Sequence, residues 1–416
     1  MQLVSHQRFL TGRTFFVCVL LIDLLQIVAL DMYTPALPVM QQAFGVSALH
    51  MNQTVFMFLL FSAVAMVLSG SVSDQKGRKP VLVFASVLFT ASSVVCTVSQ
   101  SMTVLVLGRC GQAIGYGISS TIAPALLKDS YQGRDLKTSL SLMQSLVIIG
   151  PVAAPFLGSL MLGLMDWRGI FVLLAVFGAI TIVLTLLVTE TLPPEARTHE
   201  GFARTTRLMG TDMKRLTKVK GFRSLTVFFA LGGMPFFAFI ACSSYILLDE
   251  FGLGYLEYSL VYAAACFVNM LAPYVYLVLS KKLDIRRIGI VCTALTCVSA
   301  VLLAAFAHLG AAFLLLAFVP YALAEGIIRP GAYIELLDQP PTLVGTASAL
   351  SSFSYCIVTA LITVVATMPW PTFLFGLVCI TAFTAALLAV LAARDGRSWD
   401  ACRYNEVERP SRKETA

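Results

Sequence analysis

The fold of this chain is indicated most clearly by the stretch at positions 70–80, which reads Gly70-Ser71-Val72-Ser73-Asp74-Gln75-Lys76-Gly77-Arg78-Lys79-Pro80. The stretch is strongly basic and lies between two long apolar runs. Glycine permits tight turns and close packing of the backbone, and basic residues face the anionic inner leaflet of a membrane. We therefore predict a turn between two membrane-spanning helices on the cytoplasmic side. The alternative is an arbitrary charged loop of a membrane protein.

The composition independently indicates a membrane protein. Hydrophobic residues make up 58% of the 416 residues, charged residues only 12%, and the mean hydropathy is +0.85. Soluble domains carry roughly a quarter charged residues. The charges cluster and leave apolar runs of about 20 residues, which is enough for a spanning helix. We predict an all-α fold with twelve transmembrane helices, at approximately 14–37, 50–73, 81–99, 102–127, 138–163, 169–189, 224–248, 258–280, 286–308, 311–334, 344–367 and 371–393.

The basic residues predict the orientation, because Lys and Arg stay on the cytoplasmic side. With both termini inside, all but three of the 29 basic residues fall in cytoplasmic segments. The exceptions are Arg168 in an outer loop and Arg109 and Arg329 inside helices. The net charge of +7 is therefore a sign of topology and does not indicate nucleic-acid binding.

The sequence contains no motif typical of metal sites, nucleotide-binding ATPases or serine hydrolases. The ten cysteines lie almost all in apolar spans without metal-ligand spacing, and no P-loop or nucleophile elbow is present. We therefore predict that the protein is not an enzyme, binds no cofactor and does not use ATP as its energy source. The first apolar run has spanning length and no clear cleavage site, so it reads as a helix and not as a cleaved signal peptide.

The longest polar stretch divides the spans into six and six. We predict an N-terminal half at 1–190, a cytoplasmic linker at 191–223, a C-terminal half at 224–393 and a cytoplasmic tail at 394–416. Such a two-half plan places a substrate site between the halves near mid-membrane. The linker forms either an amphipathic helix around 202–219 or a solvated connection.

Several motifs carry a resemblance to a known family. The stretch at 70–80 resembles the G-x-x-x-D-x-x-G-R-[KR] loop between helices 2 and 3 of the major facilitator superfamily. ALDMYTPALP at 29–38, RCGQ at 109–112, GPVAAPFLG at 150–158, WRGIF at 167–171, ETLPP at 190–194 and GTASAL at 345–350 are similar to the bicyclomycin-resistance (Bcr/CflA) drug:proton antiporters. The resemblance covers nearly the whole chain, although Ala113 replaces an expected glycine, and Glu325 and Arg329 depart from the pattern.

This resemblance implies a proton-coupled exporter of small organic compounds at the bacterial inner membrane, working by alternating access. One alternative is a narrow exporter of a single metabolite, amino acid or siderophore-like ligand, and another is a membrane sensor that moves nothing. The expected partners are a small-molecule substrate, protons and the lipid bilayer, with no nucleic acid, and the expected state is a monomer.

Ionisable residues inside spanning helices are costly and therefore functional or paired. Asp31 and Arg109 lie roughly 10 Å below the outer boundary, at 1.5 Å per residue, so a pair between them is possible. The resemblance implies that both take part in proton coupling. The alternative is a permanent buried ion pair.

Asp23 precedes Asp31 by about two helical turns, so both side chains can face one cavity. A carboxyl group near the midplane suits a site that alternately holds and releases a proton, and the alternative is a protonated carboxyl bonded to a neighbouring helix. Glu325 lies at a similar depth and would form a two-sided acidic site with Asp23. The i,i+4 spacing to Arg329 instead favours an intrahelical ion pair.

The remaining site predictions follow from position and resemblance. Gly70, Asp74, Gly77, Arg78 and Lys79 lie far from the midplane and are predicted to act in conformational switching. The resemblance implies that Gly150, Pro151, Pro155 and Gly158 seal the cavity against ion leak, whereas ordinary tolerance of proline in membrane helices is the alternative. The predicted substrate contacts are Tyr33, Asn52, Gln112, Gln144, Phe237, Phe239, Tyr245, Asn269, Glu325 and Arg329, although phenylalanine packs equally well against lipid.

Overall fold

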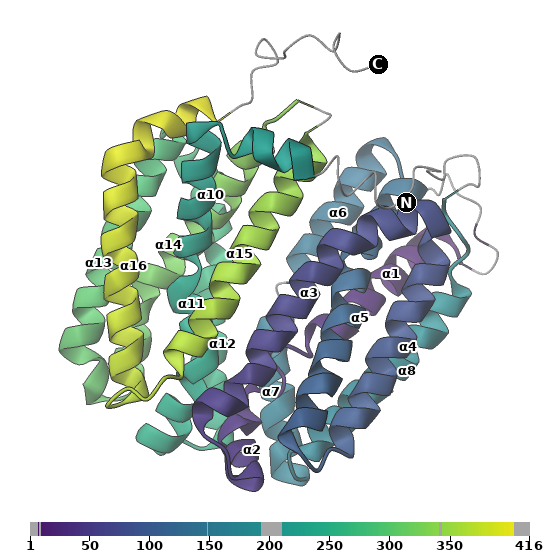
Figure 1. The fold of residues 1–416 in the computed structure, drawn as a ribbon, viewed down its shortest axis with the longest axis horizontal. Helices are drawn as coiled ribbons and strands as arrows, with labels where there is room; N and C mark the ends of the chain where they lie inside the picture. Colours follow the sequence, from purple (N-terminus) through teal and green to yellow (C-terminus); the bar gives the residue numbers. More distant parts are fainter. Residues whose placement is uncertain (1–6, 8–9, 148, 193–209, 341–342, 403–416) are drawn as a thin grey trace.

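A computed structural model of the chain describes residues 7, 10–147, 149–192, 210–340 and 343–402. Within these ranges the chain forms helices joined by short turns and contains no β-strand. The helices form two bundles that stand side by side, coloured purple to blue and teal to yellow in Figure 1. The fold is therefore the all-α, two-half architecture that the sequence predicted.

The N-terminal bundle is built from residues 12–187, and its elements are α1 (Gly12–Ile27), η1 (Thr34–Ala36), α2 (Leu37–Phe44), α3 (Ala48–Lys76), α4 (Arg78–Thr97), α5 (Met102–Ser130), α6 (Gly133–Val147), α7 (Ile149–Leu164) and α8 (Arg168–Leu187).

The C-terminal bundle is built from residues 220–401, and its elements are α10 (Lys220–Gly232), α11 (Met234–Ser244), η3 (Tyr245–Glu250), α12 (Tyr255–Leu279), α13 (Ile285–Phe306), η4 (Ala307–Leu309), α14 (Ala311–Leu337), α15 (Val344–Ala366), α16 (Phe373–Asp395) and η5 (Gly396–Ala401).

Nine helices of the described residues are long and apolar enough to cross a membrane. The other three predicted spans correspond to α1, α5 and the pair α6 and α7. Helix α5 has 29 residues but carries Arg109 and Gln112, which lower its hydropathy. Large apolar side chains such as Leu107, Leu164 and Val301 are about two thirds exposed, at 65%, 69% and 68%. An apolar surface of this kind fits contact with lipid.

The first span is broken, which corrects the prediction of one helix over 14–37. Helix α1 ends at Ile27, and residues 28–33 form turns before η1 and α2. Pro35 has no N–H for the carbonyl of Asp31, four residues earlier, and its ring opposes a continuous helix. The Thr34 N–H and hydroxyl donate to that carbonyl instead, at 3.2 and 2.7 Å. Asp31 therefore lies in a turn, and its helical offset from Asp23 does not apply.

Two further spans are interrupted near prolines. The fifth span consists of α6 and α7 on either side of residue 148, and Pro151 cannot donate to the carbonyl of Val147. The seventh span changes from α10 to α11 at Gly233, next to Pro235. Here the Tyr321 hydroxyl donates to the carbonyl of Gly232 at 2.7 Å and accepts from the Phe236 N–H at 3.0 Å. The tyrosine replaces a helical hydrogen bond at the break.

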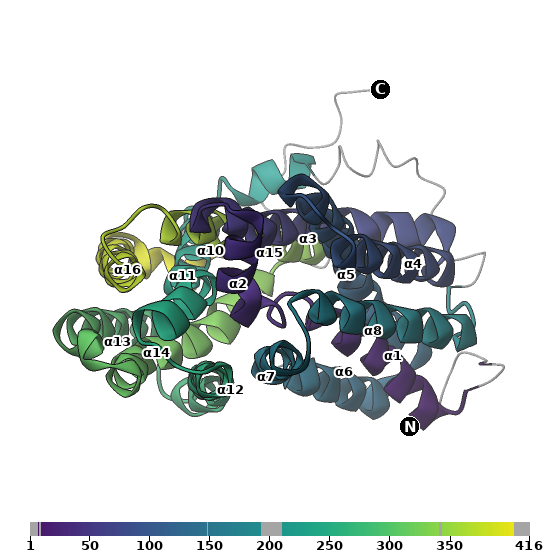
Figure 2. The ribbon, with the colours of Figure 1, turned by 90° about the horizontal axis from the view of Figure 1, so that it is seen from below.

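The end of the bundle where α3 and α16 finish is called the basic end here, because Arg78, Lys220 and Arg394 lie at the helix ends there. At the end away from the basic end, the two bundles contact each other, with α7 packed on α12 and α3 packed on α15. Figure 2 shows the bundles from that end. Nearer the basic end, a cavity of about 720 Å³ lies between α3 and α5 of one bundle and α14 and α15 of the other. The structure is thus closed at one end and open towards the basic end.

Candidate functional site

Arg109 is fully buried in the N-terminal bundle. One terminal nitrogen donates to the carbonyl of Ala29 and to Oε1 of Gln112, both at 2.9 Å. Its guanidinium lies between the rings of Tyr33 and Phe58, at 4.0 and 4.3 Å from their centroids. Within the described part of the chain, the Nε and Nη2 atoms have no hydrogen-bond partner. Cation–π contacts on both faces partly compensate for the buried charge.

Asp31 is buried at the interface of the two bundles. Its Oδ1 accepts a hydrogen bond from the hydroxyl of Tyr262 on α12, at 3.2 Å. No ion pair joins it to Arg109, whose donors are directed to Ala29 and Gln112. The permanent ion pair considered from the sequence is therefore not formed. The acid of one half contacts the other half instead.

Further hydrogen bonds link the halves near Asp31. The hydroxyls of Thr34 and Tyr258 lie 3.1 Å apart, and Tyr258 lies 3.2 Å from the Ser243 hydroxyl. Ser259 donates to the carbonyl of Pro155 at 3.1 Å and to the hydroxyl of Ser159 at 2.7 Å. These contacts hold α12 against η1 and α7 at the closed end.

The motif at 150–158, in α7, packs against the broken first span. A Cβ atom on Gly158 would overlap the backbone carbonyl of Met32, and one on Gly150 would contact the side chain of Ile27. Pro155 is buried at the contact with α12. The motif therefore lies at the junction of α1, α7 and α12, as a seal of the closed end requires. The seal itself stays a prediction.

Asp23 is buried in α1, and among the described residues its Oδ1 has no hydrogen-bond partner. Tyr116 of α5 lies within electrostatic range of it. Glu325 accepts its hydrogen bonds from Asn269 and Tyr355 of the C-terminal bundle, and the two-sided acidic site with Asp23 stays a prediction.

Glu325 and Arg329 lie one turn apart on α14 in very different surroundings. The Glu325 carboxylate is 2% exposed and accepts from Nδ2 of Asn269 and, at 3.0 Å, from the hydroxyl of Tyr355. Arg329 is 55% exposed, and its Nη1 lies 3.9 Å from Oε1 of Glu325. Its guanidinium lies 5.3 Å from the centre of the Tyr355 ring. The predicted i,i+4 contact exists but is long.

The other predicted substrate contacts are distributed unevenly. Phe237 is partly buried and packs against apolar clusters of both bundles. Phe239 is buried between Tyr262 and Phe318 in the C-terminal bundle, and it is not part of the lining of the cavity between the bundles.

Three polar candidates are also buried away from the cavity lining. Tyr245 stacks on Phe373 with its hydroxyl unpartnered. Asn52 donates to Ala48 of its own helix, and the hydroxyl of Tyr33 lies 3.1 Å from that of Thr54. Gln144 lies outside the described side chains.

The cavity lining contains residues that the sequence did not single out. Ser120 and Thr121 of α5 face Tyr333 of α14 and Ser352 and Cys356 of α15. Polar residues of this size are common in membrane helices, so only the tertiary arrangement identifies those that face the cavity.

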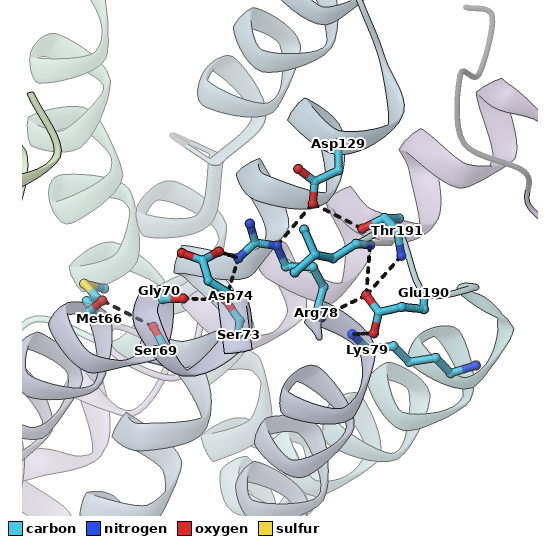
Figure 3. A network of polar contacts seen from close by, with 11 residues as sticks. Met66, Ser69, Gly70, Ser73, Asp74, Arg78, Lys79, Asp129, Glu190 and Thr191 are labelled. Carbon is cyan, nitrogen blue, oxygen red and sulfur yellow. Dashed lines mark hydrogen bonds and ion pairs between the residues drawn. The ribbon is translucent and has the colours of Figure 1, made fainter. Parts of the chain in front are cut away.

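The turn at 70–80 forms a network of charges at the basic end (Figure 3). Gly77, with φ of 97°, joins α3 directly to α4. Arg78 contacts Asp74 at 2.6 Å, Asp129 of α5 at 3.1 Å and the Ser73 hydroxyl at 2.6 Å. Asp74 and Gly70 also line the cavity, opposite Gly345 and Thr346 at the start of α15.

Glu190 completes this network. Its carboxylate accepts the backbone N–H groups of Arg78 and Lys79 at 2.9 and 3.2 Å, and so caps the N-terminus of α4. Lys79 donates to the carbonyl of Leu186 at the end of α8. The sequence reasoning missed Asp129 and treated Glu190 only as part of a motif. Both residues are acidic and lie at the cytoplasmic ends of predicted spans, close to basic residues, and this position could have indicated ion pairs with the segment at 70–80.

Comparisons with known proteins agree with this architecture. A family model described as Major Facilitator Superfamily matches residues 19–363. Multidrug resistance protein MdtL of Escherichia coli O17:K52:H18 is 28% identical over 260 residues, which are 62% of this chain and 65% of that protein. The match thus spans slightly less than two thirds of that relative. The uncharacterized MFS-type transporter YdgK of Bacillus subtilis is 26% identical over 357 residues, covering 82% of this chain and 86% of that protein.

Solved structures share the fold at low identity. A bacterial homolog of the human lysosomal transporter Spinster, in an inward-facing and unoccupied conformation, aligns with a TM-score of 0.76 at 16% identity, covering 94% of this chain and 98% of that one. A D-xylose–proton symporter aligns with a TM-score of 0.70 at 15% identity, covering 90% and 96%.

Proposed function

The chain belongs to the major facilitator superfamily, and from this membership we propose that it exports small organic compounds across a bacterial inner membrane in exchange for protons. It is a transporter and not an enzyme. The similarity to MdtL supports drug efflux as the proposed activity. The bias of Lys and Arg supports an orientation with the basic end and both termini in the cytoplasm.

The observation that carries the proposal of proton coupling is the hydrogen bond from Tyr262 to Asp31. It joins the two halves at the closed end, and one partner is a buried acid. An ionised carboxylate accepts a stronger hydrogen bond than a protonated one. Proton uptake by Asp31 thus weakens a link between the halves, and proton release strengthens it. Protonation and opening of the closed end are coupled in this way.

Arg109 acts on Asp31 from a distance in this proposal. Its fixed charge stabilises the turn at 28–33 through the carbonyl of Ala29. Substrate enters the cavity from the cytoplasmic side, and rearrangement of the halves about it gives alternating access.

Proteoliposomes with an imposed pH gradient test the proposal. We expect addition of a transported compound, with ethidium as the first probe, to change the internal pH reported by a trapped dye. Asp31→Asn should abolish that change, whereas Asp166→Asn, at an exposed site in the connection between α7 and α8, should retain it. A wild-type protein that binds compounds without any proton movement would support the sensor instead.

A narrow exporter of one compound class is the second candidate. The exposed charge of Arg329 favours it, because a fixed charge in a binding cavity selects substrates.

A further inference from the structure

Arg329 is a cation at membrane depth whose hydrogen-bonding capacity is largely unused. Its guanidinium offers five N–H donors, yet within the described part of the chain its contacts are the ion pair at 3.9 Å and the face of Tyr355. Neither contact is a hydrogen bond. A charge inside a spanning helix is expensive unless it is paired or functional.

Glu325 does not neutralise Arg329 closely, because its carboxylate is committed to other donors. Asn269 donates to Oε2 and Tyr355 donates to Oε1. Asn269 also donates to the carbonyl of Ala322, which fixes the amide. The acid is thus held at 2% exposure behind Tyr355 while the arginine is 55% exposed. A ligand that approaches from the cavity meets the cation first.

Arg329 lies one helical turn from a residue that lines the cavity. Tyr333, one turn further along the same face of α14, lines the cavity, and so does Cys356, next to Tyr355 on α15. Tyr116 of α5 lies within electrostatic range of both Arg329 and Asp23. The cation therefore faces the N-terminal half across the space between the bundles.

We propose that Arg329 binds an oxyanion group of the transported compound, so that the substrates are small organic acids or zwitterions. This inference rests on the proposed export function and specifies its substrate class. A guanidinium matches a carboxylate or a phosphate with two parallel hydrogen bonds. Stacking over Tyr355 leaves the edges of the guanidinium free for such a pair.

The first test measures thermal unfolding of the purified full-length protein in lipid nanodiscs with charge-matched probes. Phenylacetate, indole-3-acetate and N-acetylphenylalanine are each compared with their methyl esters, and phenyl phosphate represents the other oxyanion. We expect the acids or phenyl phosphate to raise the melting temperature while the esters do not, since ligands that bind the native state stabilise it. The more effective of the two oxyanions identifies the group that is bound.

Substitutions of Arg329 test whether this residue binds the oxyanion. Arg329→Gln should weaken binding of the oxyanion roughly 10- to 100-fold, as expected for loss of a charged hydrogen-bond partner. Arg329→Lys should retain part of the affinity because it keeps the charge without the planar fork. Lys282→Gln, an exposed residue of the turn before α13, is the matched control and should bind as wild type does. If Arg329→Gln is unstable, the Glu325→Gln, Arg329→Gln double variant leaves no unmatched charge and gives the same comparison.

Equal stabilisation by acids and esters, no stabilisation by any oxyanion, or unchanged binding in Arg329→Gln would each overturn the inference. The proteoliposome assay, run with ethidium and with each of the acids, separates this failure from failure of the proposed function. Proton-coupled ethidium transport without oxyanion binding removes the substrate assignment alone. Oxyanion binding through Arg329, with no proton movement for ethidium or for the bound acid, leaves the site and removes the antiport proposal.

Discussion

Asp31 in the N-terminal half accepts a hydrogen bond of 3.2 Å from Tyr262 in the C-terminal half. The acid is placed there by the break in the first span, and the tyrosine is supplied by α12, more than two hundred residues later. A titratable group thereby becomes part of the contact that closes one end of the molecule. The Tyr262–Asp31 hydrogen bond therefore contributes to the closed state, and it involves the group proposed to bind the proton.

Replacing Asp31 by Asn should abolish proton-driven transport while the protein stays folded in the membrane. Asparagine retains an oxygen that accepts from Tyr262 but cannot exchange a proton. The measurement is the substrate-induced pH change in proteoliposomes, with protein content checked by size-exclusion chromatography. A pH change equal to that of the wild type would count decisively against the role of Asp31.

Tyr262→Phe should weaken the closed end without removing the acid. Loss of one hydrogen bond, about 0.5–1.5 kcal/mol, predicts a shift of roughly two- to tenfold in the equilibrium between the two states. Accessibility of a cysteine introduced in place of Ser259 reports this shift. Tyr131→Phe, which loses a bond to Gly12 within one half, is the control. Equal accessibility in the two variants would mean that the Tyr262 contact does not hold the halves together.

Asp74→Ala or Arg78→Ala should slow transport by about tenfold, the effect of losing roughly 1.4 kcal/mol, without changing the substrate range. Both residues belong to the network that joins α3, α4 and α5 at the basic end, away from Arg329. Glu190→Ala should act similarly, because it uncaps α4. The control is Arg287→Ala, whose exposed pair with Asp284 contributes little. Loss of some substrates with others untouched would indicate direct binding instead.

Glu325 and Arg329 should contribute unequally to stability. Glu325→Ala leaves the buried donors of Asn269 and Tyr355 and a cation unmatched, so we expect about 3–5 kcal/mol of destabilisation. Arg329→Ala removes a half-exposed charge from a long pair and should cost about 1 kcal/mol or less. Denaturant unfolding in mixed micelles compares the two, and the double neutral variant should recover part of the loss. Equal destabilisation would indicate a tight ion pair.

Gly158→Ala should destabilise the junction of α7 with the turn at 28–33 by about 1–3 kcal/mol. The added Cβ would overlap the carbonyl of Met32, and backbone atoms there cannot move without disturbing Asp31. Gly163→Ala in the same helix is the matched control, since nothing lies within 4 Å of its Cβ position. Unchanged unfolding and transport in Gly158→Ala would show that the close approach is not needed.

The membrane class, the two-half plan and the number of spans could be predicted from the residue order alone. These depend on the length of apolar runs and on the distribution of charge, which are local properties of the chain. The sequence also located the turn at 70–80, because glycine spacing and basic residues act within a few positions. The breaks near Pro35, Pro151 and Pro235 were readable in principle, since proline removes a specific helical hydrogen bond.

Which polar groups meet depends on the packing of the folded helices. Asp31 contacts Tyr262 and not Arg109, Glu325 accepts from Asn269 and Tyr355, and Arg329 is left 55% exposed. Each partner is distant in sequence or lies on another helix, and its approach depends on how the helices rotate and pack. Depth along a helix can be counted from residue number, but the direction of a side chain across a bundle cannot. That direction is set by close contacts such as Gly158 on Met32, which exist only once both halves have folded.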